Sequence, residues 1–164
     1  MKYTYMFSHA LEEDKVQQLI DITMNYEKVD IYFSGPGGNV SNMRVLINYL
    51  NGREGITIYV DDYIGSCSSL LIFKYLTCPI VITKDFTEAL FHKMDITLRF
   101  QRQDGRDRKY IKKWIKDYNR DISKWLKDKV TKKQRKKYDK GYDLVINRDQ
   151  IISTFCNKKN ISYE

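Results

Sequence analysis

The sequence predicts a mixed α/β fold built around a largely parallel β-sheet. Across residues 1–92, short apolar segments typical of strands alternate with segments whose apolar residues recur every three or four positions, as in amphipathic helices. A glycine-rich turn at residues 34–38 (SGPGG) separates one such strand from the following helix. The 164 residues, 42% hydrophobic and 30% charged, suit a single folded domain over residues 1–164 and exclude a disordered chain.

Each element follows from local spacing of apolar residues and from the residues that end it. We expect strands at residues 3–7, 29–33, 56–60, 80–83 and 89–92, and residues 144–146 with 150–155 close the chain. Helices are expected at residues 12–26, 40–50, 68–76 and 110–130. Asn39 should cap the second helix, and Asn51-Gly52 should end it.

The positive charge is concentrated in one stretch. The net charge of the protein is +8, but residues 99–140 carry +12 and the rest of the chain carries −4. Within this basic region, apolar side chains at helical spacing predict a long amphipathic helix whose Lys and Arg side chains face solvent. Its apolar residues are Ile111, Trp114, Ile115, Tyr118, Ile122, Trp125, Leu126 and Val130. Nucleic acid and an acidic protein are weaker alternatives as partners, since no known nucleic-acid-binding motif accompanies the helix.

Several classes of protein are not expected. No stretch approaches 18 consecutive apolar residues, and residues 1–5 do not begin a signal peptide, so we expect a cytoplasmic protein without membrane contact. The three cysteines, Cys67, Cys78 and Cys156, form no CxxC pair. A disulfide framework, a metal site and a cofactor are therefore not expected.

Two junctions between a strand and a helix have residue types suited to chemistry. Gly37 and Gly38 precede a helix and would expose backbone N–H groups able to hold an anion or an oxyanion. Residues 65–69 (GSCSS) place small hydroxyl and thiol residues at the start of the next helix. Neither segment is a P-loop, a GxGxxG motif or a GxSxG motif. Taken singly, each is equally compatible with a tight turn or with packing.

Only two histidines are present as bases for a serine nucleophile. His92 ends a strand, where active-site residues of α/β sheets gather. His9 also follows a strand but lies among polar residues, and we interpret it as structural or solvent-exposed.

Four segments together resemble the ClpP family of proteolytic subunits. Residues 31–40 (IYFSGPGGNV) resemble its glycine-rich segment, and residues 65–69 resemble its GxAAS nucleophile motif. Residues 90–93 (LFHK) and 143–150 (DLVINRDQ) are similar to the segments that supply its histidine and aspartate. The segments occur in the family's order and near its spacing, over residues 3 to 155. The resemblance implies a ClpP/crotonase-like βαβ spiral, with residues 99–140 as an extended basic handle helix.

The resemblance also implies a serine endopeptidase with a Ser-His-Asp triad. Ser69 would attack the peptide carbonyl, His92 would take the proton, and Asp143 would orient the imidazole. Backbone N–H groups of Gly38 and Leu70 would form the oxyanion hole. Gly37 would contact the substrate, a peptide or an unfolded protein. Asp95, three residues after His92, is the rival orienting carboxylate.

The resemblance further implies a homo-oligomeric ring. The chain begins almost at its first strand, so we expect no N-terminal segment for docking an ATPase and expect activity independent of ATP. Leu70-Leu71 follows Ser69 where the family has Met-Gly, and the family's glycine-rich run after the histidine is missing. Three alternatives remain: an inactive or specialised ClpP-like assembly protein, a crotonase-like acyl-CoA enzyme, and a nucleic-acid binder acting through the basic helix.

Overall fold

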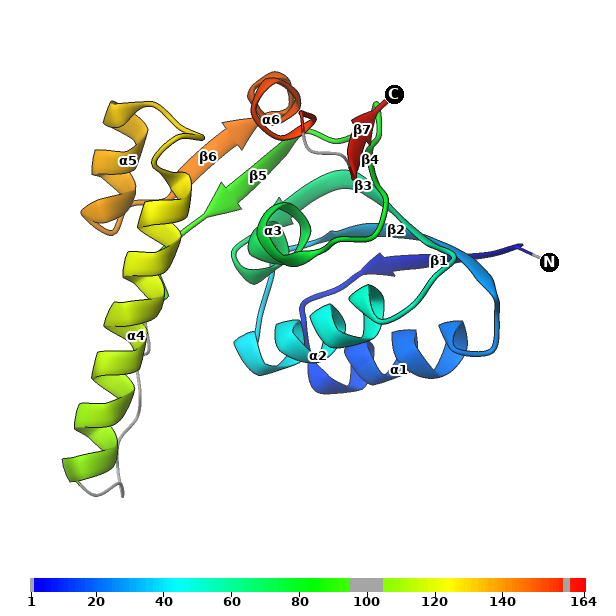
Figure 1. Ribbon diagram of the computed structural model, residues 1–164, viewed down its shortest axis with the longest axis horizontal. Coiled ribbons are helices and arrows are strands. Elements are labelled where there is room, and N and C mark those ends of the chain that lie inside the picture. The colour runs from blue at the N-terminus through cyan, green and yellow to red at the C-terminus, as the bar shows by residue number, and fades with distance from the viewer. Residues whose placement is uncertain (1, 95–104, 158–159) are drawn as a thin grey trace. The chain divides into compact units, whose positions relative to one another are not determined.

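The computed structural model describes residues 2–94, 105–157 and 160–164 (Figure 1). The chain divides into two compact units. The first, which we call the sheet unit, comprises Met1–Phe91 and Val145–Glu164. The second, the helical unit, comprises His92–Leu144.

The central element is a seven-stranded, mostly parallel sheet in the described part of the chain. Its strands are β1 (Lys2–Ser8), β2 (Lys28–Gly35), β3 (Ile56–Gly65), β4 (Ile80–Ile82), β5 (Glu88–Phe91), β6 (Leu144–Asn147) and β7 (Ile161–Tyr163). The order is β1-β2-β3-β4-β7, and β5 pairs with both β3 and β6. These observations confirm the predicted α/β class and the largely parallel sheet. Strand β7 was not predicted.

Strand β3 is longer than the sequence predicts, and this length allows it to pair with two different strands on one side. Its first part pairs with β4, from Ile58 opposite Ile80, and its last part pairs with β5, from Tyr63 opposite Glu88. The prediction ended the strand at residue 60 because two aspartates follow. Asp62 does adopt a positive φ of 52°, but pairing with β5 carries the strand through this bend to its end.

The helices of the sheet unit are α1 (Glu13–Thr23), α2 (Val40–Asn51), α3 (Cys67–Leu70) and α6 (Arg148–Phe155). Helices α1 and α2 lie side by side against one face of the sheet (Figure 1). Asn39 caps α2 as predicted, because its side-chain oxygen accepts the N–H of Ser41 at 2.7 Å. Helix α3 continues as the π-helical turn η1 (Leu71–Tyr75). The core is formed by apolar side chains such as Phe7, Phe33, Leu46, Ile58 and Phe155.

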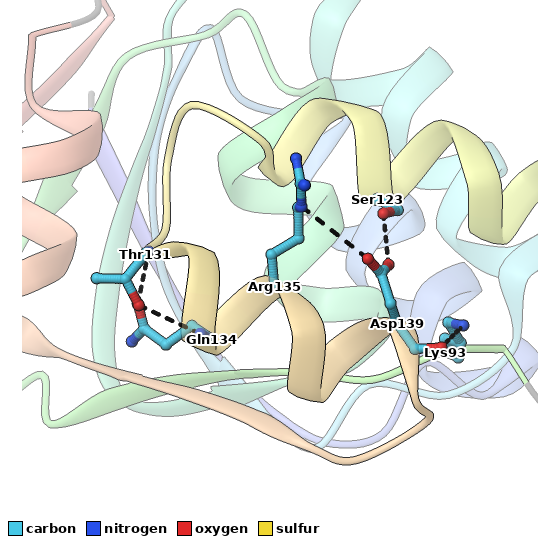
Figure 2. Close-up of polar contacts among 6 residues, drawn as sticks. All are labelled: Lys93, Ser123, Thr131, Gln134, Arg135 and Asp139. Atoms are coloured by element: carbon cyan, nitrogen blue, oxygen red, sulfur yellow. Dashed lines mark hydrogen bonds and ion pairs between the residues drawn. The ribbon is translucent and has the colours of Figure 1, made fainter.

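The helical unit contains α4 (Gly105–Leu126) and α5 (Lys132–Asp139). The basic region was predicted as one helix reaching Val130, which is wrong at its end. Thr131 and Gln134 form a capping box that begins α5: the Thr131 N–H donates to Gln134 Oε1 at 2.9 Å, and the Gln134 N–H donates to Thr131 Oγ1 at 3.2 Å (Figure 2). Within the described residues, no helix is long and apolar enough to cross a membrane.

Candidate active site

A strained turn joins β3 to α3 at Ser66. This residue lies between the end of the strand and the first residue of the helix, with φ 54° and ψ −120°. A residue with a Cβ adopts this region at a cost of about 1–3 kcal/mol, which the surrounding structure must offset. A strained strand-to-helix turn is also the backbone arrangement that presents a nucleophilic serine in hydrolases. Because the GxSxG motif is absent, this turn could not be predicted from the sequence.

Three serines follow one another closely here, and their surroundings differ. Ser66 is partly exposed, whereas Ser68 and Ser69 are fully buried. The Ser69 hydroxyl donates to the carbonyl of Leu90 at 2.8 Å and lies 3.2 Å from the carbonyl of Ile64. A serine hydroxyl has one hydrogen to donate, so it serves one of these acceptors at a time. The residue predicted as nucleophile is thus placed as a buried donor to the backbone.

The glycine-rich turn after β2 lies directly against the Ser66 turn. A Cβ on Gly37 would lie 2.5 Å from the carbonyl oxygen of Gly65, 2.7 Å from Cβ of Ser66 and 2.9 Å from the backbone N of Cys67. Its φ of 98° is likewise suited to glycine. The absence of a side chain at Gly37 is therefore what allows the two turns to approach. The structure thus brings Gly37 and Gly38 to the segment predicted to contain the nucleophile.

The backbone donors near Ser66 are only partly those expected. Burial raises the pKa of the Cys67 thiol, while hydrogen bonds from the Ser66 hydroxyl and the Gly38 N–H act in the opposite direction. The Gly38 N–H therefore faces the Cys67 sulfur. The N–H of Leu70, the second predicted oxyanion donor, points along its helix to the carbonyl of Ser66 at 3.3 Å. The first residue of a helix has no acceptor for its N–H within that helix, and here that residue is Cys67.

His92 and Asp143 come together in the helical unit. Nδ1 of His92 lies 3.8 Å from Oδ1 of Asp143, and both side chains are well exposed, at 43% and 61%. The distance fits an ion pair with a protonated imidazole and exceeds that of a hydrogen bond. The structure therefore places together the histidine and the aspartate that the motifs predicted. Asp95, the rival carboxylate, lies outside the described residues.

The two residues after His92 are held by the helices of the same unit. The side-chain amide of Asn119 on α4 accepts the Met94 N–H at 2.8 Å and donates to the Met94 carbonyl at 2.9 Å. Lys93 Nζ donates to the carbonyl of Asp139 at the end of α5 (Figure 2). The Asp139 carboxylate in turn accepts the Ser123 hydroxyl at 2.5 Å, which joins α5 to α4. The sequence did not reveal these contacts of Asn119.

His9 lies just after β1, beside the glycine-rich turn that follows β2. It follows β1, is exposed, and its ring meets Phe7 edge-on with centroids 5.8 Å apart. A Cβ on Gly35 would come within 3.1 Å of its carbonyl carbon, so its backbone abuts the glycine-rich turn. His9 is the second imidazole that a test of the base must address.

Comparison with known proteins adds no assignment. The sequence matches no protein-family model and no curated protein. Among the residues that the structure describes, no cluster of His, Cys, Asp or Glu is suited to hold a metal ion.

Proposed function

We propose that the protein is a serine peptidase in which Ser66 is the nucleophile, His92 the general base and Asp143 its orienting carboxylate. The observation that carries this proposal is the strained turn at Ser66, between a parallel strand and a helix and directly against the glycine turn at Gly37. Ser69, the nucleophile expected from the motif, is the alternative, but its hydroxyl is buried and directed at backbone carbonyls.

The reaction is acyl transfer to water. Oγ of Ser66 attacks the substrate carbonyl, and its proton passes to His92 and then to the departing amine. Water attacks the acyl-enzyme with His92 again as the base, and the serine is restored. Each step conserves protons and requires no cofactor.

The developing oxyanion would be met by the N–H groups of Cys67 and Gly38. Cys67 follows the nucleophile and opens α3, so its N–H has no acceptor within the helix. The Gly38 N–H faces a thiol, which is a weak acceptor that a negatively charged oxygen would displace. With Ser66 as nucleophile, the second N–H donor of the oxyanion hole would be Cys67 instead of Leu70. Gly37 would still contact the substrate.

A fluorophosphonate probe tests the proposal, because it reacts with an activated serine. We expect labelling of the wild-type protein at Ser66, identified by peptide mass spectrometry. Ser66→Ala should abolish labelling and the hydrolysis of an unfolded protein substrate. Ser69→Ala is the matched control: it removes one hydrogen bond worth about 1 kcal/mol and should leave labelling within about twofold of wild type.

The other outcomes are equally informative. Labelling that is lost in Ser69→Ala and kept in Ser66→Ala would restore Ser69 as the nucleophile. Absence of labelling in a folded wild-type protein would contradict the peptidase and favour a ClpP-like assembly protein without activity. Circular dichroism of each variant establishes that it is folded.

We further propose that the fold is the ClpP/crotonase-like spiral and that the active form is a homo-oligomer. The branching of β3 between β4 and β5, and the glycine turn against the α3 turn, support the first statement. Apolar side chains along α4, including Trp114 and Ile115, are only half-buried among the described residues, and this supports the second. Light scattering coupled to size-exclusion chromatography measures the assembly, and a monomer at all concentrations would contradict the ring.

A further inference from the structure

Five lysines line one hollow on the helical unit. The hollow has a volume of about 540 Å³, and its lining residues are Lys132, Lys133, Lys136, Lys137 and Lys140. They recur at one- and three-residue intervals, which places them on one face of α5 and its C-terminal cap. No acidic side chain contributes to the lining. We call these five residues the lysine cluster.

The lysine cluster is unfavourable for the isolated helix. Like charges four residues apart, as in Lys132 and Lys136, destabilise a helix by a few tenths of a kcal/mol per pair. Lys132 and Lys133 also occupy the first turn, where the helix dipole favours negative charge and where no acidic residue is present. Within the described residues, no ion pair involves the cluster. Binding of a polyanion would remove this repulsion.

An exposed aromatic ring follows the lysine cluster. Tyr142 is 64% exposed, and its backbone N–H donates to the carbonyl of Lys137 at 3.1 Å. The chain therefore turns back onto α5, so that Tyr142 follows the C-terminal end of the cluster with its side chain exposed. Cations along a row together with an aromatic ring are what proteins use to bind single-stranded nucleic acid, with phosphates on the cations and a base stacked on the ring.

We propose that the lysine cluster and Tyr142 bind the phosphodiester backbone of single-stranded nucleic acid without sequence preference. The cluster spans eight helical steps, or about 12 Å, and carries the same charge throughout. A polymer with a negative charge on every unit can pair with these lysines wherever along its length it binds. An acidic peptide can do so only at the positions that carry a carboxylate. The exposed ring favours the polymer that also carries bases. This binding does not depend on Ser66 or on peptidase activity.

Fluorescence polarisation of labelled oligothymidylate and oligouridylate with the full chain tests the proposal. Five phosphate contacts on a single strand predict that log affinity falls against log salt with a slope of about −3.5. The double variant Lys136→Gln/Lys137→Gln should weaken binding and reduce the slope by about 1.4. Lys28→Gln/Lys84→Gln has the same net charge, lies in the sheet unit at exposed positions, and should leave both quantities unchanged.

Tyr142→Ala should weaken binding about tenfold without changing the salt slope, because stacking releases no counterions. A labelled duplex should bind more weakly than either single strand. Equal slopes in the two lysine variants would overturn the site, and so would failure of both oligonucleotides to bind. Binding of polyglutamate in place of the oligonucleotides, lost in Lys136→Gln/Lys137→Gln, would assign the cluster to an acidic protein and overturn the nucleic-acid proposal.

Discussion

The backbone N–H of Ser66 donates to the carbonyl of Leu90 at 2.8 Å. This bond ties the strained turn after β3 to β5, the strand that leads into His92. The same carbonyl accepts the hydroxyl of Ser69. Ser69 therefore reinforces the turn from within, and Ser66 lies where the turn meets solvent. The Leu90 carbonyl thus accepts the hydroxyl of Ser69 but only the backbone N–H of Ser66, and this distinguishes a structural serine from the candidate nucleophile three residues before it.

The approach of the two turns depends on Gly37. Gly37→Ala should lower the free energy of unfolding by about 2–5 kcal/mol, because the new Cβ would meet three atoms of the Ser66 turn and the backbone has positive φ. Labelling of Ser66 by the fluorophosphonate should fall in the variant that remains folded. Urea unfolding followed by circular dichroism gives the stability.

Gly141 offers a matched control for this effect. Its φ of 90° resembles the 98° of Gly37, but a Cβ there would meet nothing within 4 Å. Gly141→Ala therefore introduces the backbone strain without the collision and should cost about 1–2 kcal/mol. Equal losses of stability in the two variants would show that the close approach at Gly37 contributes nothing.

The identity of the general base is tested with the two histidines. His92→Gln should slow fluorophosphonate labelling by roughly a factor of 10²–10⁴, whereas His9→Gln should change it by less than about twofold. The rate is measured at one pH and at equal probe concentration for wild type and both variants. A large loss in His9→Gln with a normal rate in His92→Gln would transfer the role of base to His9.

The sheet was predictable because apolar residues in its strands are local signals. Residues 29–33 and 56–60 form uninterrupted or alternating apolar runs, and both became strands. The extension of β3 past Asp61 was missed because it depends on pairing with β5, which no local pattern encodes. The end of α4 and the start of α5 were also not predicted. The spacing of apolar residues indicated one continuous helix, and the capping box of Thr131 and Gln134 was not recognised.

The sequence indicated which segments form the candidate site, but not the surroundings of each side chain. The motifs led to the glycine turn, to residues 65–69 and to the His92–Asp143 pair, which the structure brings within 3.8 Å. The distinction between Ser66 and Ser69 was out of reach, because it rests on one φ angle and on burial. Asn119 was equally invisible, since its role is defined by a backbone segment that lies 25 residues away in sequence.

The buried thiol of Cys78 makes the free energy of unfolding depend on pH in the alkaline range. Burial raises the pKa of Cys78 from 9.0 to about 11. Because the folded-state pKa lies above the unfolded one, the contribution of the protonated thiol to stability is complete below pH 9.0 and is lost as pH rises through about 11. The difference in unfolding free energy between wild type and Cys78→Ala should therefore shrink over this range. It is measured by urea titration at each pH.

Cys156→Ala is the control for this prediction. Cys156 is only partly buried, and the charge of Arg148 opposes the effect of burial on its pKa. The difference in unfolding free energy between wild type and Cys156→Ala should therefore change less over the same pH range. A constant difference for Cys78→Ala up to the highest pH would contradict a raised thiol pKa at that position.

Asn119 should affect the candidate base without touching it. Its amide makes two hydrogen bonds to the backbone of Met94, two residues after His92. Asn119→Ala removes both and should lower the free energy of unfolding by about 1–3 kcal/mol. Asn119→Asp keeps the acceptor for the Met94 N–H and loses only the donor, so its effect should be intermediate. A role in positioning His92 also predicts slower labelling of Ser66 in the same order. Loss of stability with a wild-type labelling rate would show that Asn119 holds the segment together but does not position the histidine.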